Sequence, residues 1–199
     1  AWACFSFEFW WCMKRKVMLL IKPVAIFFLS IFFEKKYLSG RYFDQSLMGV
    51  RWCFYSLWVR NIMRLARPLP FPAALTCHVS NPNKIFFHPD DVNNFQSPGV
   101  YFQNFKAEIH IGKGTYIGPN VGVITANHDV TNLVAHDVGK SVIFGRDCWI
   151  GMNSTIMPGV CLGDRVIVGA GSVVTKSFES GNVVIAGVPA KVIRKVDVK

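Results

Sequence analysis

The sequence predicts an all-β main domain built as a parallel β-helix, with an α-helical arm before it. The prediction depends on apolar residues that recur every six positions and on compact residues four positions after most of them. Strands alternate every two residues and helices about every 3.6, so a period of six fits neither element alone. Short parallel strands that turn a corner every six residues fit it, because one apolar side chain per flat face then points inward. Three faces complete one coil, and stacked coils bury a continuous apolar column.

The repeat fills much of the second half of the chain and stops once. Its six-residue series consists of Ile111, Ile117, Val123, Phe144, Ile150, Ile156, Leu162, Val168 and Val174. The compact residues are Thr115, Val121, Cys148, Ser154, Val160, Val166 and Ser172. From Val123 to Phe144 the spacing is 21 residues, which is not a multiple of six. We therefore expect residues 129–140 to leave the coil as a loop, and loops on rigid scaffolds often carry function.

Positive charge is concentrated before the repeats. Residues 1–74 contain eleven Lys/Arg and three Asp/Glu, a net charge of +8, whereas residues 75–199 carry +2. This asymmetry predicts binding to an anionic surface, either a membrane or a nucleic acid. No nucleic-acid-binding motif accompanies the charge, so we expect a membrane and no nucleic acid. The six cysteines form neither a CxxC pair nor a cluster with histidine, which favours a reduced, cytosolic setting.

The chain is expected to divide into three parts. Residues 1–12 differ in character from the rest, and we interpret them as an upstream extension or non-native sequence. Residues 13–72 form a basic, partly hydrophobic helical arm that ends in a proline-rich hinge. Residues 73–199 form the β-helix domain, with its loop at 129–140 and a C-terminal cap.

Residues 14–67 of the arm are expected to contact a membrane surface. The apolar segment 17–33 is interrupted by a Lys-Pro pair and is shorter than the about twenty residues of a spanning helix. Residues 47–65 carry aromatic side chains, and a regular helix would place the nearby Arg60, Arg64 and Arg67 on one face, as in an interfacial helix. The alternative is an amphipathic helix that packs on the main domain or on a neighbouring subunit.

One histidine stands where the repeat breaks off. His128 lies at the root of the loop, and a neutral imidazole there can act as a general base toward a hydroxyl near neutral pH. The alternative is a loop histidine that is hydrogen-bonded to backbone. His136, within the loop, is a candidate for contact with substrate. Asp129 is poorly placed to orient the imidazole of its neighbour, so the partner of His128 stays open.

Five sequence blocks, in this order, resemble the hexapeptide-repeat acyltransferases, above all the polysaccharide and sugar O-acetyltransferases. The blocks are residues 127–129, 145–154, 157–164, 168–176 and 186–194. The resemblance covers roughly residues 80–196, and several blocks in order are more specific than any single hexad. It implies a left-handed coil, a homotrimer, and acetyl-CoA as a cosubstrate held between neighbouring subunits, without a metal.

The resemblance also implies roles for individual residues. His128 is the general base for an acceptor hydroxyl, and Asn104, Asn127 and Trp149 bind the acceptor. Backbone N–H groups and cations bind the cofactor, and their candidates are Ala170, Gly171, Ser172, Thr175, Lys176, Lys191 and Arg194. Met152 stands where sugar acetyltransferases often carry serine, so the resemblance does not carry over that side-chain contact to the cofactor.

These expectations describe an acetyl-CoA-dependent O-acetyltransferase acting on a sugar hydroxyl of a surface polysaccharide or its lipid-linked precursor. It is expected in the cytoplasm, peripheral on the inner face of the cytoplasmic membrane. Serine, an amino-sugar nitrogen or an antibiotic are alternative acceptors. Two other classes stay open. One is a zinc enzyme like the γ-class carbonic anhydrases, which would need His110, His128 and His136 to converge across a subunit boundary, and the other is a non-catalytic trimeric scaffold.

Overall fold

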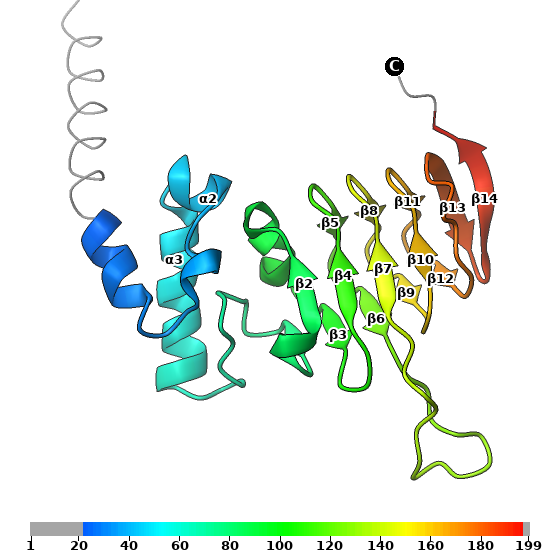
Figure 1. Cartoon of the computed structure of the whole chain (residues 1–199), viewed down its shortest axis with the longest axis horizontal. Helices are drawn as coiled ribbons and strands as arrows, with labels where there is room; N and C mark the ends of the chain where they lie inside the picture. Colours follow the sequence, from blue (N-terminus) through cyan, green and yellow to red (C-terminus); the bar gives the residue numbers. More distant parts are fainter. Residues whose placement is uncertain (1–21, 197–199) are drawn as a thin grey trace, which may run out of the picture. The chain divides into compact units, whose positions relative to one another are not determined.

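A computed structural model of the chain describes residues 22–196 and divides it into two units, residues 1–72 and residues 73–199 (Figure 1). The predicted extension, residues 1–12, lies outside the described residues. So does the first part of the apolar segment 17–33. Each unit has its own architecture, and the two are described separately.

The first unit is helical. Residues 22–29 form a helix, and η1 (Lys35–Tyr37), α2 (Arg41–Asp44), α3 (Met48–Ser56) and η2 (Leu57–Ile62), a π-helical continuation of α3, follow. Leu29, Phe43 and Cys53 are fully buried at its centre. A Cβ at Gly49 would lie 2.5 Å from the Phe43 ring, so a glycine lets α2 and α3 pack closely. Within residues 22–196, no helix combines the length and the apolar character that crossing a bilayer requires.

The arginine face predicted for this unit is wrong. The helix ends at Ile62, and Arg64 adopts a left-handed backbone conformation with φ of 53°. Arg60 is only 2% exposed, and its Nη1 donates a hydrogen bond to the carbonyl of Arg67 at 2.7 Å. A π-helical turn also holds more residues than an α-helical one, so the i, i+4, i+7 spacing does not define one face. Arg60 closes the turn after the helix instead of joining an exposed stripe.

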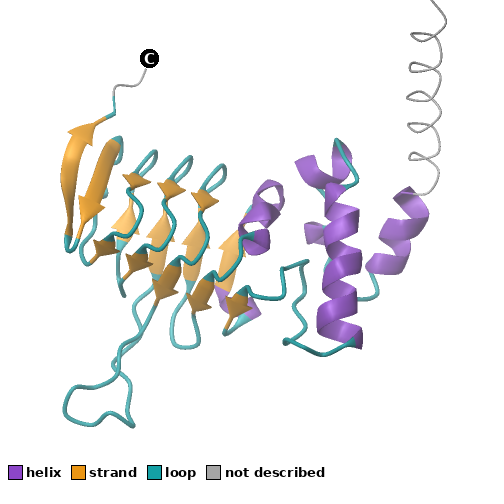
Figure 2. Cartoon of the chain, turned by 180° about the vertical axis from the view of Figure 1, so that it is seen from behind, coloured by secondary structure: helices purple, strands orange, loops and turns teal. Residues whose placement is uncertain are grey.

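The second unit is a three-sided coil of short strands (Figure 2). Sheet A contains β1 (His78–Val79), β3 (Tyr101–Gln103), β6 (Gly122–Ile124), β9 (Thr155–Ile156) and β12 (Val173–Val174). Sheet B contains β2 (Ile85–Phe87), β4 (Ile109–Ile111), β7 (Val142–Phe144) and β10 (Cys161–Leu162). Sheet C contains β5 (Tyr116–Ile117), β8 (Trp149–Ile150), β11 (Ile167–Val168), β13 (Val183–Gly187) and β14 (Ala190–Lys195).

Neighbouring strands in each sheet are parallel, except that β13 and β14 form an antiparallel hairpin. The 3-10 helices η3 (Pro82–Lys84) and η4 (Pro89–Gln96) belong to the first, less regular coils. The predicted fold, a parallel β-helix with helices before it, is therefore confirmed.

The predicted apolar column forms the core of the coil. Every residue of the six-residue series is buried, with at most 4% of its surface exposed. The compact residues four positions later are buried as well, and several hydrogen-bond across coils. Thr115 Oγ1, for example, donates to the carbonyl of Gly145 at 2.8 Å and accepts from Cys148 N–H at 3.1 Å. The period thus specifies both the apolar core and the polar side chains that hydrogen-bond to backbone groups at its corners.

A column of glycines lies where successive coils approach most closely. A Cβ at Gly112 would overlap the carbonyl of Gly145, and a Cβ at Gly145 would lie 2.5 Å from the carbonyl carbon of Gly163. A Cβ at Gly163 would in turn meet the carbonyl of Glu179. Backbone faces backbone at this corner, which leaves no room for a side chain.

The coil is interrupted once, between β6 in sheet A and β7 in sheet B. The chain leaves the coil after Ile124, forms a protruding loop, and returns so that Phe144 pairs with Ile111 of the preceding coil (Figure 1). We call this position the A–B corner, and the position between β11 and β12 the C–A corner. The long spacing between Val123 and Phe144 thus corresponds to one excursion at a single corner.

Candidate active site at the A–B corner

His128 lies at the root of the protruding loop, and its side chain is exposed. Its Nδ1 is 2.8 Å from the carbonyl oxygen of Leu133, on the far side of the loop. A carbonyl only accepts hydrogen bonds, so Nδ1 carries the hydrogen in this contact. In the neutral ring Nε2 then holds the lone pair, which is the arrangement a general base requires. Leu133 supplies the orienting partner that the sequence left open.

Two aromatic rings pack beside the imidazole of His128. The His136 ring lies 4.3 Å from the His128 ring at 33°, and the backbones of the two histidines form an isolated antiparallel bridge. Phe105 packs edge-on against His136 at 5.0 Å. His136, expected to be a substrate contact, therefore packs directly against His128.

Gln103 fixes the backbone that leads into His128. Its Oε1 accepts hydrogen bonds from the N–H groups of Thr125 and Ala126, each at 3.0 Å, and its Nε2 donates to the Ala126 carbonyl at 2.9 Å. The sequence analysis missed this residue. The signal available was a polar side chain at a strand end, directly beside β6 in the preceding coil.

Asp129 shapes the loop and is not the orienting partner of His128. Its carboxylate accepts hydrogen bonds from Thr131 Oγ1 at 2.6 Å, from Thr131 N–H at 2.7 Å and from Asn132 N–H at 3.2 Å. The hydrogen bonds from Thr131 are the main reason why the pKa of Asp129 lies below its ordinary value. A negative charge at this position thus favours the tight turn at the loop tip.

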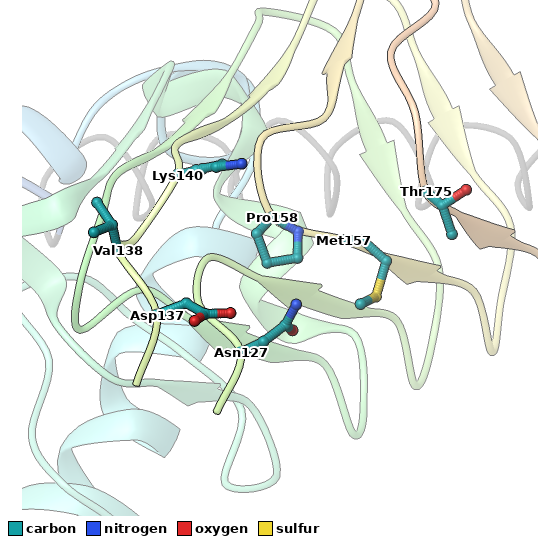
Figure 3. A pocket seen from close by; sticks show the side chains of 7 residues that line it. All are labelled: Asn127, Asp137, Val138, Lys140, Met157, Pro158 and Thr175. Carbon is teal, nitrogen blue, oxygen red and sulfur yellow. The ribbon is translucent and has the colours of Figure 1, made fainter. Parts of the chain in front are cut away.

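A cavity of about 510 Å³ opens at the same corner (Figure 3). Its lining residues are Asn127, Asp137, Val138, Lys140, Met157, Pro158 and Thr175. Asn127 and Asp137 lie at one edge and Thr175 at the other (Figure 3). Of the predicted site residues, Asn127 and Thr175 line this cavity, and His128 directly follows Asn127. The sequence analysis missed Asp137, Lys140 and Met157. Asp137 and Lys140 lie in the loop outside the matched blocks, and Met157 lies in the block 157–164, to which no site role was given.

Other predicted site residues lie on the outer face of sheet C. Strand registers place Tyr116, Trp149, Ile167, Val184 and Arg194 in one row across the sheet. The row is an outer one because the residue after each of the first four, such as Ile150 after Trp149, is buried in the core.

A β-bulge brings a second cation to that face. Lys191 pairs with Ala186 and Arg194 with Val184, and a register shift between Val184 and Ile185 separates the two pairs. Residues 184 and 186 lie on the same face of β13. Lys191 and Arg194 therefore share a face, although their spacing of three would separate them on a regular strand.

Ala170 and Gly171 occupy the C–A corner and are exposed. Gly171 has φ of 69°, and a Cβ there would meet nothing within 4 Å, so the turn leaves open space beside its backbone. Thr175 and Lys176 follow β12 and so belong to the A–B corner with His128. The predicted residues thus form two groups, which sheet A separates within one chain.

The positions of two predicted residues require corrections. Asn104 is fully buried; its Oδ1 accepts from Asn81 N–H at 2.8 Å and its Nδ2 donates to the Asn81 carbonyl at 2.6 Å. Ser172 is also buried, and its hydroxyl donates to the Gly169 carbonyl and accepts from Gly187 N–H. Both side chains join neighbouring coils. Asn104 is therefore not available to an acceptor, nor the Ser172 side chain to a cofactor.

Within one chain, the three histidines of the zinc alternative do not converge. His110 lies on sheet B, stacked on Phe86 and 2.9 Å from Glu108 Oε2, whereas His128 and His136 pair in the loop. Among the residues described, no three His, Cys, Asp or Glu side chains are grouped so that they could hold a metal ion.

Comparison with known proteins identifies the family. A family model described as bacterial transferase hexapeptide (six repeats) matches residues 141–176. A putative acetyltransferase of Dictyostelium discoideum is 41% identical over 133 residues, which cover 60% of this chain and 70% of that protein. The chain belongs to the hexapeptide-repeat acetyltransferase family.

Two further members of the hexapeptide-repeat acetyltransferase family illustrate the extent of similarity. Galactoside O-acetyltransferase of Escherichia coli K12 is 34% identical over 132 residues, which cover 53% of this chain and 62% of the enzyme. The hexapeptide-repeat acetyltransferase of Vibrio cholerae, whose structure was solved with acetyl coenzyme A, is 29% identical with a TM-score of 0.49; the match covers 57% of this chain and 60% of that one. The chain spans between 45% and 62% of the length of the first relatives it matches.

Proposed function

We propose that the protein is an acetyl-CoA-dependent O-acetyltransferase that acts on a sugar hydroxyl, with His128 as the general base. The observation that carries the proposal is the fixed imidazole of His128. Its Nδ1 is held by the Leu133 carbonyl, and no hydrogen bond within the described part of the chain occupies Nε2. The similarity to a galactoside O-acetyltransferase supports a sugar as acceptor.

The proposed reaction is a direct transfer within a ternary complex. Nε2 of His128 removes the proton of the acceptor hydroxyl while the hydroxyl oxygen bonds to the thioester carbonyl carbon. The carbon–sulfur bond then breaks, and the proton passes from His128 to the departing thiolate. The Leu133 carbonyl stabilises the transient imidazolium by accepting the Nδ1 hydrogen bond.

The cysteines of the coil do not favour an acyl-enzyme route. The thiolate is the nucleophilic form of cysteine, so a raised pKa lowers reactivity at neutral pH. Burial is the main cause that raises the pKa of both Cys148 and Cys161. Neither residue lines the cavity at the A–B corner.

The division of candidate residues between two corners supports a homotrimer. His128, Asn127, Thr175 and Lys176 lie at the A–B corner, whereas Ala170 and Gly171 lie at the C–A corner of the same chain. A three-fold arrangement of parallel coils would bring the A–B corner of one copy against the C–A corner and sheet C of the next. We propose that acetyl-CoA binds between two such copies, so that each site takes residues from both.

Two cations on sheet C are the proposed contacts for the phosphates of coenzyme A. Lys191 and Arg194 share the outer face, and Trp149 lies on the same face two strands from β13. Clustered ammonium and guanidinium groups suit phosphate oxygens, and the guanidinium can bind two oxygens at once. The exposed backbone of Ala170 and Gly171 is proposed to meet the pantetheine arm.

The helical unit supports an acceptor at a membrane. Large apolar side chains are exposed on it: Val24, Phe27, Ile31, Phe54, Trp58, Ile62 and Leu65. Residues 22–72 also carry eight Lys/Arg against two Asp/Glu. Exposed aromatic and aliphatic side chains beside positive charge favour the interface of an anionic bilayer. We propose that the protein sits on the inner face of the cytoplasmic membrane and acetylates a surface polysaccharide or its lipid-linked precursor.

The proposed chemistry is tested with labelled acetyl-CoA and a panel of acceptors: galactosides, other free sugars, amino sugars, serine and lipid-linked oligosaccharides. We expect transfer to a hydroxyl-bearing sugar and a loss of about 10²–10⁴-fold in His128→Ala, because general-base catalysis is worth that much. His110→Ala is the matched control, since His110 lies on sheet B away from the loop. Full transfer by His128→Ala would refute the base assignment, and transfer only to nitrogen or serine would refute the sugar hydroxyl.

A further inference from the structure

The helical unit contains a cavity of its own. It measures about 500 Å³ and is lined by Asn61, Arg64, Ala66, Arg67 and Pro68. These residues belong to the end of η2 and the turn that follows it. We call this cavity the Arg64 pocket, and the proposed acetyl transfer makes no use of it.

The walls of the Arg64 pocket are tied together by hydrogen bonds. Leu65 N–H donates to the Val59 carbonyl at 3.0 Å, which folds the chain back on η2 after Arg64. From the buried side, Arg60 Nη1 donates to the Arg67 carbonyl at 2.7 Å. The pocket is therefore preformed, and a third arginine adds positive charge behind its wall.

The lining combines cations with a neutral acceptor. Arg64 is exposed, and Arg64 and Arg67 both carry guanidinium groups, which bind phosphate oxygens in pairs. Asn61 Oδ1 is shielded from solvent and has no hydrogen-bond partner among the described residues. A shielded polar atom without a partner is unfavourable, and Asn61 Oδ1 would gain a partner if a ligand hydroxyl displaced the groups that cover it. The chemistry thus matches a phosphate ester with a hydroxyl close to it.

The surroundings of the pocket are apolar and exposed. Trp58, Ile62, Met63 and Leu65 flank it in sequence, and each has at least half of its surface in solvent. Side chains of this kind partition into the boundary between headgroups and acyl chains. A pocket among them would lie at the depth where lipid phosphates are found.

We infer that the Arg64 pocket binds the headgroup of an anionic glycerophospholipid through its phosphodiester and an adjacent hydroxyl, as phosphatidylglycerol offers. The inference rests on the proposed membrane association of the helical unit and adds a defined site to it. The phosphodiester contacts Arg64 and Arg67, and a glycerol hydroxyl donates to Asn61 Oδ1. Phosphatidylserine has the same net charge but presents an ammonium and a carboxylate in place of that hydroxyl pair.

The test is flotation of the full chain with vesicles of phosphatidylcholine alone, or mixed with equal fractions of phosphatidylglycerol or phosphatidylserine. We expect binding to phosphatidylglycerol to be the tightest. Arg64→Asn, which removes the charge while asparagine tolerates a positive φ, should abolish that preference. Asn61→Leu should abolish it too, without a change in net charge. Arg51→Gln is the matched control, because Arg51 is an exposed arginine of α3. It should weaken binding to both anionic mixtures about five-fold and preserve the preference for phosphatidylglycerol.

Equal binding of the wild type to both anionic lipids, or equal effects of Arg64→Asn and Arg51→Gln, would overturn the pocket and leave membrane association intact. Failure to bind any vesicle would overturn both. Competition by soluble glycerophosphoglycerol at the same concentration of headgroup would assign the site to a free phosphate ester instead of a lipid. The acetyl-transfer assay with free sugars is independent of all three outcomes.

Discussion

At the scale of single residues, His128 depends on neighbours that are distant in sequence. Leu133 orients its Nδ1, His136 packs against its ring, and Gln103 holds the backbone before it. Of these three residues, only His136 was singled out from the sequence, and it was expected to contact substrate. The position of a candidate base is thus set by packing between coils and by the loop's own turn.

Gln103→Leu is predicted to reduce acetyl transfer more than it reduces stability. The change leaves the buried N–H and carbonyl of Ala126 without their side-chain partner, at a cost of about 1–3 kcal/mol, and frees the backbone that positions His128. Thr115→Val is the control, because it also removes side-chain hydrogen bonds to backbone, here those to Gly145 and Cys148, which lie outside the loop. Urea unfolding and the transfer rate measure the two effects; equal losses of activity in both variants would contradict the positioning role.

The free energy of unfolding is predicted to fall above pH 9.0. Burial raises the pKa of Cys53 from 9.0 to about 12, so the unfolded chain loses this proton first. A group whose pKa is raised in the folded state stabilises it below the unfolded pKa, and that contribution is lost as pH rises toward the folded value. Burial of Tyr37 acts in the same direction.

Urea unfolding under reducing conditions, at neutral pH and between pH 9.0 and 12, measures this loss. Cys53→Ala should be less stable throughout because it leaves a cavity, but its stability should fall less steeply with pH. Parallel curves for the wild type and Cys53→Ala would show that the thiol does not contribute.

At the scale of elements, the close stacking of successive coils limits which side chains fit into the β-helix. The six-residue series predicted the buried column, and the glycines that follow it mark the corner where backbone meets backbone. In the helical unit the same kind of reasoning failed for the arginines, because a π-helical segment and a left-handed residue changed the period after Ser56. Regular spacing predicts faces only as far as the regular element extends.

Gly145→Ala is predicted to destabilise the coil by about 1–3 kcal/mol, since its Cβ would press on backbone that has no rotamer to change. Gly122→Ala is the matched control within the same β-helix, because the nearest neighbour of a Cβ at Gly122 would be the Thr155 side chain at 3.9 Å. The stability of this variant should change little or rise by up to about 1 kcal/mol. Thermal and urea unfolding of both variants test this, and equal stabilities would refute the close approach.

At the scale of the whole molecule, the candidate residues form two groups within one chain. His128 and the cavity lie at the A–B corner, while the exposed turn and the paired cations lie at the C–A corner and on sheet C. The site that we propose between two copies would bring the two groups together and would make activity depend on assembly.

The protein is therefore predicted to be a trimer of about three times 22.4 kDa, measured by light scattering at the elution peak. Mixing an inactive His128→Ala chain with an inactive Lys191→Ala, Arg194→Ala chain should restore activity, because some sites in mixed trimers combine the two intact halves. A monomeric mass together with full activity would contradict a shared site.

The sequence by itself determined the parallel β-helix, the buried column and the place where the coil is interrupted, because these follow from a period that every coil repeats. It also singled out His128, which stands at that interruption. Only the tertiary structure decided what surrounds His128. Leu133 reaches its ring through a loop turn, and Gln103 holds the backbone before it through coil stacking, and neither contact leaves a periodic signal in the sequence. The tertiary structure also showed that the side chains of Asn104 and Ser172 are buried in hydrogen bonds. Sequence spacing does not show which polar side chains neighbouring coils engage in this way.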